Sequence, residues 1–221
     1  MSAAGRGGRF VVLEGIDGAG TTTQTALLAE TLRSEGVRVR ATREPSDGPI
    51  GALIRQVLSG RVVAPIEGGT TALGWEPMAL LFAADRMDHV QCEIAPFVAQ
   101  GGVVISDRYD ASSLAYQSVT SGRAEGDPLA WIRVLNQRAQ RPDLTIVLDI
   151  SAEAAAARRS ARGEAAQIYD ANEVQRALAA FYKNLPHHMP GDRIAVLDAD
   201  APVDVVRARV LEVYRTAFAP H

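Results

Sequence analysis

Glycines that follow the first apolar run of the chain form a pattern that could bind phosphate. Gly15, Gly18 and Gly20 come soon after residues 10–13, and a helical pattern rich in alanine and leucine comes next. Glycines let the backbone curl so that successive N–H groups point at an anion, and the positive end of the following helix adds to that attraction. The sequence therefore predicts a phosphate-binding loop made of Gly15, Gly18, Ala19, Gly20, Thr21, Thr22 and Thr23.

One position of this loop departs from the usual phosphate-binding pattern. The pattern G-x-x-x-x-G-K-[ST] is met by Gly15, Gly20 and Thr22, but Thr21 stands where the pattern has lysine. The alternative for the stretch is a tight strand-to-helix turn that binds nothing. Other polar clusters must decide between the two interpretations.

Two such clusters follow later apolar segments. Arg43 and Glu44 come after the second predicted strand, and Asp107 and Arg108 come after the third. In parallel sheets ligands bind beyond the carboxyl ends of the strands, so we expect these side chains to meet the glycine loop. Separate structural ion pairs are the alternative for each cluster taken alone.

Apolar runs and helical periodicity alternate along the chain, which is typical of a parallel sheet covered on both faces. The predicted strands lie at 10–15, 37–42, 103–105, 144–150 and 194–197. The predicted helices lie at 22–35, 49–58, 76–99, 111–120, 128–138, 152–162, from about 172 to 185, and 202–218. Residues 60–74, rich in glycine, are expected to be an irregular loop. The sequence thus predicts an α/β fold with five parallel strands in one domain, 10–221, after a flexible leader, 1–9.

Composition limits the partners. The chain has 221 residues and a net charge of −3, which gives no reason to expect nucleic-acid binding. No apolar run approaches the roughly 20 residues of a membrane span. The one cysteine, Cys92, excludes an internal disulfide, fits a cytoplasmic protein, and is expected to be a buried thiol. Because 22 residues are arginine and Lys183 is the one lysine, cationic sites must be built almost entirely from arginine.

Several stretches, in this order and spacing, resemble the thymidylate kinase family of P-loop nucleoside-monophosphate kinases. The stretches are LEGIDGAG at 13–20, TREP at 42–45, LLFAADR at 80–86, DRY at 107–109, SSLAYQ at 112–117, PDL at 142–144, LD at 148–149 and RGE at 162–164. The resemblance covers about residues 10–217. It implies a three-layer sandwich of the P-loop NTPase type and transfer of the γ-phosphoryl group of ATP to dTMP, giving dTDP for dTTP biosynthesis.

The resemblance also implies roles for individual residues. Thr22 and Asp107 would hold Mg²⁺, and Asp17 and Arg108 would act in catalysis. The dTMP site would contain Asp17, Arg43, Phe82, Arg86, Arg108, Ser113 and Tyr116. The family further suggests a homodimer formed through the helix at 76–99. Phe82 could instead be an ordinary core residue, although Arg86 one turn away does not suit an apolar stripe.

The lid over ATP, at about 158–171, also departs from the family pattern, because Gln167 stands where a second arginine is expected. Arg158, Arg159 and Arg162 remain on the preceding helix. We expect Arg158 or Arg162 to supply the charge that Thr21 cannot. Two other functions stay open: a nucleotide-binding homologue with weakened activity and a regulatory role, and a kinase for another nucleoside monophosphate.

Overall fold

The computed structural model describes residues 7–122, 126–162 and 172–219. A parallel sheet lies at its centre, with the strand order β2-β5-β1-β6-β7. The strands are β1 (Arg9–Glu14), β2 (Val39–Arg43), β5 (Val103–Asp107), β6 (Leu144–Asp149) and β7 (Ile194–Asp198). The five predicted strands and the α/β class are confirmed.

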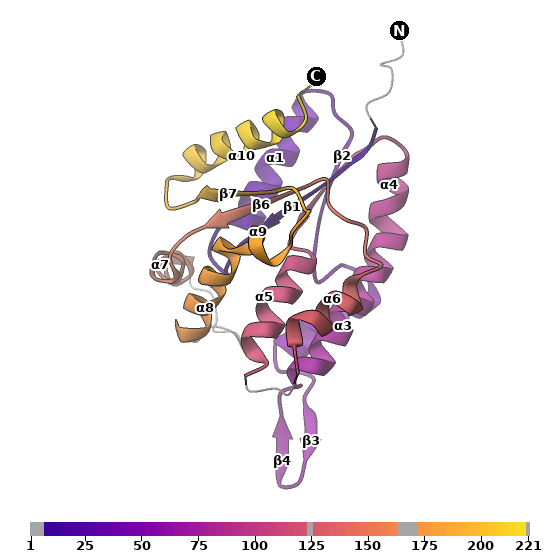
Figure 1. The fold of residues 1–221 in the computed structure, drawn as a ribbon, viewed down its shortest axis with the longest axis vertical. Coiled ribbons are helices and arrows are strands. Elements are labelled where there is room, and N and C mark those ends of the chain that lie inside the picture. The colour runs from indigo at the N-terminus through magenta and orange to yellow at the C-terminus, as the bar shows by residue number, and fades with distance from the viewer. Residues whose placement is uncertain (1–6, 123–125, 163–171, 220–221) are drawn as a thin grey trace.

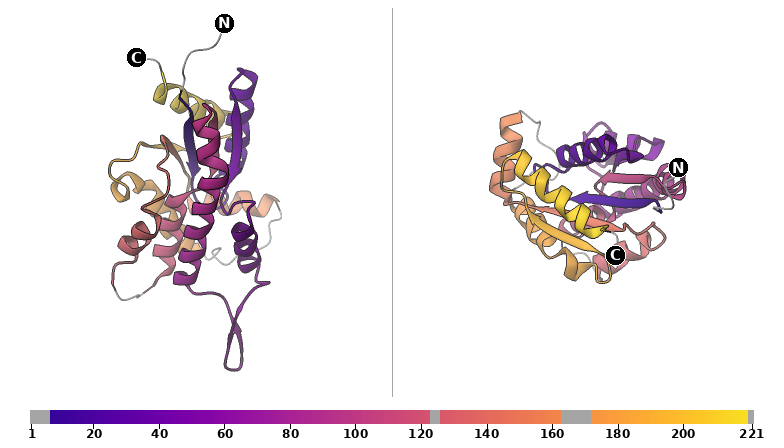
Figure 2. Two further views of the ribbon diagram at one scale, coloured as in Figure 1. Left: turned by 90° about the vertical axis from the view of Figure 1, so that its right-hand side faces the viewer. Right: turned by 90° about the horizontal axis from the view of Figure 1, so that it is seen from above.

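Helices cover both faces of this sheet, as the three layers require (Figures 1 and 2). They are α1 (Thr21–Ser34), α2 (Pro49–Leu58), α3 (Trp75–His89), α4 (Ala95–Ala99), α5 (Asp110–Thr120), α6 (Pro128–Asn136), α7 (Ala152–Arg162), α8 (Asn172–Lys183), α9 (Leu185–His188) and α10 (Val203–Ala217). Helices α1 and α10 pack side by side, while α5 packs against α3, α6 and α8 (Figure 1).

The side chains of β1 alternate between two clusters of buried residues. Val11 and Leu13 belong to a large cluster that also includes residues of α1, α5, α8 and α10. Phe10 and Val12 belong to a smaller cluster with Phe97 of α4. Because β1 is apolar on both faces, it can occupy the middle of a sheet that is covered on both sides.

The register of the strands places the polar clusters at one edge. Leu13 of β1 and Arg43 of β2 both lie opposite Asp107 of β5. The residues that follow these strands therefore begin at the same end of the sheet. The polar residues after β1, β2 and β5 therefore converge, as the parallel topology predicted.

Two predicted elements differ from the structure. Residues 64–71 form a short antiparallel hairpin, β3 (Ala64–Ile66) and β4 (Gly69–Thr71), so the prediction of an irregular loop over 60–74 was wrong there. The hairpin projects from the body (Figure 1). The helix expected at 76–99 contains a π-helical segment, η1 (Val90–Ile94). Pro96 has no amide hydrogen to complete the α-helical ladder there, a local cause for such a widening.

Two further expectations concern single features. Cys92 is exposed, so the prediction of a buried thiol was wrong; its Sγ lies 3.5 Å from Asp88 Oδ1. Within the described ranges, no helix has the length and apolar character needed to cross a membrane. Residues 1–6 of the expected leader and 163–171 of the expected lid lie outside the described residues, and Arg9 already belongs to β1.

Candidate active site

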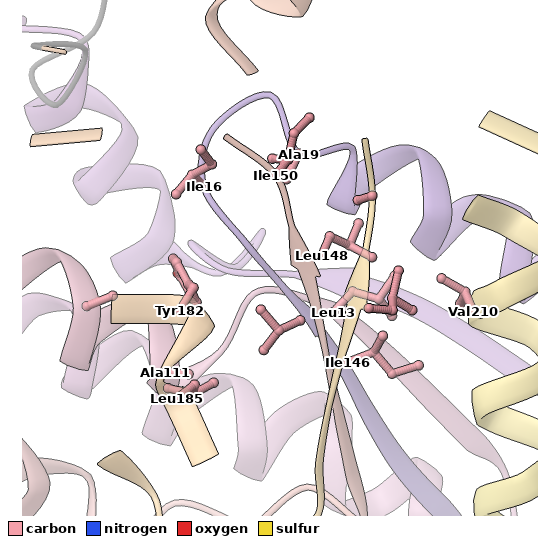
Figure 3. Packing of buried hydrophobic residues seen from close by; sticks show 14 of the residues in the cluster. Leu13, Ile16, Ala19, Ala111, Ile146, Leu148, Ile150, Tyr182, Leu185 and Val210 are labelled. Atoms are coloured by element: carbon pink, nitrogen blue, oxygen red, sulfur yellow. The ribbon is translucent and has the colours of Figure 1, made fainter. Parts of the chain in front are cut away.

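The loop between β1 and α1 has the backbone conformation that its glycines allow. Gly18 and Gly20 have φ angles of 93° and 99°, in the left-handed region that favours glycine. A Cβ on Gly18 would lie 2.5 Å from the carbonyl oxygen of Ala155 in α7, so this position has no room for a side chain. Ile16 and Ala19 of the loop are buried and anchor it to the large cluster (Figure 3). The core and α7 thus hold the loop in place, and α1 begins directly after it at Thr21.

Thr22 and Asp107 meet at this loop. The Thr22 hydroxyl donates a hydrogen bond to Asp107 Oδ2, and Asp107 Oδ1 is buried without a hydrogen-bond partner in the described part of the chain. The described residues contain no cluster of three or more His, Cys, Asp and Glu side chains that could hold a metal. One carboxylate beside one hydroxyl fits Mg²⁺, which usually keeps several waters and completes its shell with substrate phosphates.

A cavity beside the loop gathers six of the seven residues that the resemblance assigned to dTMP: Asp17, Phe82, Arg86, Arg108, Ser113 and Tyr116. Its other lining residues are Glu44, Pro45, Leu58, Tyr109, Ser112 and Gln117. Phe82 also packs against the apolar cluster of Ile54, Val57 and Met78, so it serves the core and the cavity together. The cavity thus combines ring faces with two arginines and two carboxylates.

Arg108 links the cavity to the glycine loop. Its Nη2 donates to Asp17 Oδ1 at 2.6 Å, and its Nη1 donates to the Gly15 carbonyl oxygen at 2.8 Å. Its guanidinium also lies over the ring of Tyr116, 5.3 Å from the centroid. Among the described residues other than glycine, only Arg108 has a positive φ, 72°. Such strain persists where the surroundings hold a residue in place, and it clusters at functional sites.

Arg86 is fully buried, and several acceptors fix its orientation. Its Nη2 donates to Glu44 Oε2 at 2.6 Å and to Ser113 Oγ at 3.1 Å, and its Nη1 donates to Asn136 Oδ1 at 2.5 Å. Burial lowers the pKa of Arg86, but Glu44, Asp110 and Tyr109 together outweigh it, so that the pKa lies above its ordinary value. Arg86 is therefore a fixed cation and hydrogen-bond donor at the wall of the cavity.

Glu14 has a central place in the site that its sequence position did not suggest. It is completely buried at the end of β1 and accepts hydrogen bonds from Tyr109 N at 2.8 Å, Ser112 N at 3.2 Å, Ser112 Oγ at 2.7 Å and Tyr182 Oη at 3.1 Å. Burial raises its pKa from 4.5 to about 7, although the nearby Arg108 acts in the opposite direction. Glu14 thus holds the first turn of α5 and two hydroxyls that contact Arg108. The one available signal was a charged residue at the end of a buried apolar strand.

Other residues without an assigned role also shape the cavity. Gln117 is buried, lines the cavity, and its Oε1 accepts no hydrogen bond from the described residues. Asp85 is buried and accepts two hydrogen bonds from Ser46, from its N at 2.7 Å and its Oγ at 2.6 Å, which fixes the turn after β2. His89 contacts the second Glu44 oxygen at 3.2 Å and Thr42 Oγ1 at 2.8 Å. These partners are far apart in sequence, so local patterns could not pair them.

Two candidate arginines whose side chains the structure describes, Arg43 and Arg158, do not line this cavity. Arg43 is exposed at the end of β2 and pairs with Asp47 at 2.7 Å. Arg158 of α7 donates to the carbonyl oxygens of Ala199 at 2.9 Å, Ala201 at 3.2 Å and Ala19 at 3.4 Å. The side chain of Arg162 lies outside the described part of the structure. Arg158 therefore lies against the loop and the residues after β7.

Comparison with known proteins agrees with this architecture. A family model described as "Thymidylate kinase" matches residues 13–210. The chain is 43% identical over 187 residues to a "Probable thymidylate kinase" of Pyrococcus horikoshii, covering 85% of this chain and 87% of the relative. It is 41% identical over 204 residues to a "Probable thymidylate kinase" of Pyrococcus abyssi, covering 92% and 94%.

A third relative has a comparable identity to this chain. The "Thymidylate kinase" of Thermomicrobium roseum is 39% identical over 203 residues, which cover 89% of this chain and 90% of the relative. The matched region includes the glycine loop, the cavity and the residues that connect them. The chain belongs to the thymidylate kinase family.

Proposed function

We propose that this protein transfers the γ-phosphoryl group of ATP to dTMP and forms dTDP. The observation that carries the proposal is the bridge formed by Asp17 and Arg108 between the glycine loop and the adjoining cavity. The loop would bind the donor phosphates, and Arg108 would hold the acceptor phosphate in line with them. Phosphoryl transfer depends mainly on such positioning and on charge stabilisation.

Thymine is the base that the polar groups of the cavity suit best. Arg86 can only donate hydrogen bonds, which matches the O4 acceptor of thymine and opposes the amino group of cytosine. Gln117 Oε1 is an unpaired buried acceptor, and the N3–H group of thymine is a suitable donor for it. Phe82 offers a ring face for the base, and Tyr116 lies beside Arg108 where the sugar and phosphate would enter.

Mg²⁺ and Arg43 complete the proposed site. Thr22 and Asp107 would hold Mg²⁺, which neutralises phosphate charge when it is bound. Arg43 would be a second ligand of the acceptor phosphate, since it follows β2 directly before the buried Glu44 at the cavity wall. Its present partner, Asp47, is exposed and can release it at little cost.

A homodimer is also proposed, through the outer face of α3. Leu80 of α3 and Leu53 of α2 are large apolar side chains with 51% and 42% exposure, on helices that pack against each other. A Leu80→Glu variant should sediment as a monomer if this face is buried between two copies. Unchanged sedimentation of both proteins as monomers would contradict the proposal.

The substrate test is a coupled ADP-release assay with ATP, Mg²⁺ and each nucleoside monophosphate in turn. We expect dTMP to give the highest kcat/KM, with dUMP as the matched control that lacks the thymine methyl group, and with dCMP and AMP far below. Faster turnover of dCMP or AMP than of dTMP would overturn the assignment. Gln117→Leu should raise KM for dTMP with a smaller effect on kcat, because the contact would be to the unreactive base.

A further inference from the structure

Position 21 leaves the donor site without a cation that phosphoryl transfer normally uses. Thr21 is buried and uncharged, and residues 15–22 contain no arginine or lysine. Charge on the transferring phosphoryl oxygens is usually balanced by such a cation as well as by the metal. Some other positive side chain must therefore reach the loop if the site is to work.

The other cationic side chains that the structure describes near the site have partners that hold them in place. The one lysine, Lys183, lies 3.8 Å from Asp149 Oδ2 and is largely exposed. Arg108 faces the acceptor cavity and is tied to Asp17. Arg158 donates to the carbonyl oxygens of Ala199 and Ala201 after β7 and, at 3.4 Å, to that of Ala19 in the loop, so three carbonyl groups hold it.

Arg159 has a different position on the same helix. Its Nη1 donates to the carbonyl oxygen of Asp17, in the middle of the loop. Helix α7 packs directly on this part of the loop, since a Cβ on Gly18 would meet Ala155 O at 2.5 Å and Arg159 Cγ at 3.2 Å. The guanidinium therefore lies on the backbone that would surround the donor phosphates.

Asp17 joins this arginine to the acceptor site. Its carbonyl oxygen is bound by Arg159 and its carboxylate by Arg108, so two guanidinium groups lie on either side of one residue. Asp17 belongs to the glycine loop and also lines the cavity, so both contacts lie at the boundary between the two parts of the site. Arg158 also reaches the loop, but at the Ala19 carbonyl oxygen at 3.4 Å, and its two shorter contacts are to residues after β7, whereas Arg159 contacts Asp17 itself.

We infer that Arg159 supplies, from α7, the positive charge that a lysine at position 21 would supply. This rests on the proposed kinase function and replaces the sequence-based choice of Arg158 or Arg162. With nucleotide bound, Arg159 exchanges the Asp17 carbonyl oxygen for a phosphate oxygen, and its planar fork can contact two such oxygens. Thr21 and Arg159 thus form one compensating pair, in which the cation has moved from the loop to the helix above it.

The test compares steady-state turnover of Arg159→Gln, Arg159→Lys, Thr21→Lys and the double variant Thr21→Lys/Arg159→Gln with wild type. Glutamine keeps a neutral N–H donor and removes the charge, and Arg159→Lys keeps the charge without the planar fork. Arg176→Gln is the matched control. Arg176 is an exposed arginine of α8, and it pairs with Glu153 of α7, the helix that carries Arg159. Circular dichroism and calorimetric titration with dTMP establish that each variant is folded and binds the acceptor.

Arg159→Gln should lower kcat by about 10² to 10⁴-fold, the range expected when a cation or donor at the transition state is lost. Its affinity for dTMP should stay within a few-fold of wild type, and Arg176→Gln should leave kcat unchanged. Arg159→Lys and the double variant should each have a kcat at least about tenfold above that of Arg159→Gln, because either lysine places a charge at the same phosphates.

Three results would overturn the inference. The first is a kcat for Arg159→Gln within a few-fold of wild type. The second is a loss that neither lysine restores, which would assign Arg159 to holding the loop. The third is an inactive wild type that gains activity from Thr21→Lys alone, which would show that no cation serves the site. The assay uses whichever nucleoside monophosphate wild type phosphorylates best, so an incorrect choice of acceptor would not decide the role of Arg159.

Discussion

Replacing Glu14 by glutamine should make the protein more stable at alkaline pH and leave its stability near pH 4 almost unchanged. Glu14 is completely buried, and burial raises its pKa from 4.5 to about 7. The folded protein therefore keeps a proton that the unfolded chain releases between these two values. Stability must fall as pH rises from about 4.5 to about 7, and it levels off above that range.

The size of the effect follows from the same pKa values. Each unit of difference in pKa is worth about 1.4 kcal/mol, so ionisation of Glu14 in the folded protein costs about 3 kcal/mol by pH 8. Glutamine mimics the protonated side chain. Its carbonyl oxygen can accept from Tyr109 N and Ser112 N, while its amino group can donate to the hydroxyl oxygens of Ser112 and Tyr182, which rotate to accept.

The measurement is urea unfolding of both proteins from pH 4 to pH 8.5 at constant ionic strength. The difference in unfolding free energy should grow from near zero to about 3 kcal/mol in favour of Glu14→Gln. His188, whose pKa is lowered by burial, gives the opposite slope in both proteins and cancels in the difference. Parallel curves, with a constant difference at every pH, would refute the argument that Glu14 holds a proton near neutrality.

Three other sets of substitutions test the site geometry. Arg108→Gly and Arg108→Ala should both lower kcat/KM for dTMP by about 10²-fold or more. The glycine variant should be more stable than the alanine variant by about 1 kcal/mol, because the φ angle of residue 108 is 72°. Equal stability of the two variants in thermal unfolding would argue against backbone strain. Asp107→Asn should lower kcat and raise the Mg²⁺ concentration needed for half-maximal activity, with little change in dTMP affinity, and an unaltered Mg²⁺ dependence would exclude the metal role. Gly18→Ala should reduce activity more than Gly20→Ala, since only the first new methyl group meets a backbone atom, at 2.5 Å; similar losses in ATP turnover would contradict this ranking.

Local patterns were sufficient for the sheet and for the chemistry at its edge. The apolar runs that became β1, β5 and β6 are buried on both sides, which is the condition under which a strand reads as a continuous apolar run. Parallel strands end at a common edge, so Asp107 and the glycine loop had to converge. The hairpin at 64–71 was missed because Pro65, Gly68 and Gly69 are turn signals, and three-residue strands carry too few side chains to show a period.

Tertiary structure decided which residues act together. Glu14 and Tyr182 are 168 positions apart, and their hydrogen bond depends on the packing of α8 against α5 and β6. Arg158 and Arg159 are neighbours in an alanine-rich helix and look interchangeable in sequence. Successive residues of an α-helix point about 100° apart, however, so when α7 packs on Gly18 one arginine reaches the carbonyl oxygens after β7 and the other reaches Asp17. From the sequence we could predict only that an arginine would replace the missing lysine, whereas the proposal of Arg159 depends on how α7 packs on the loop.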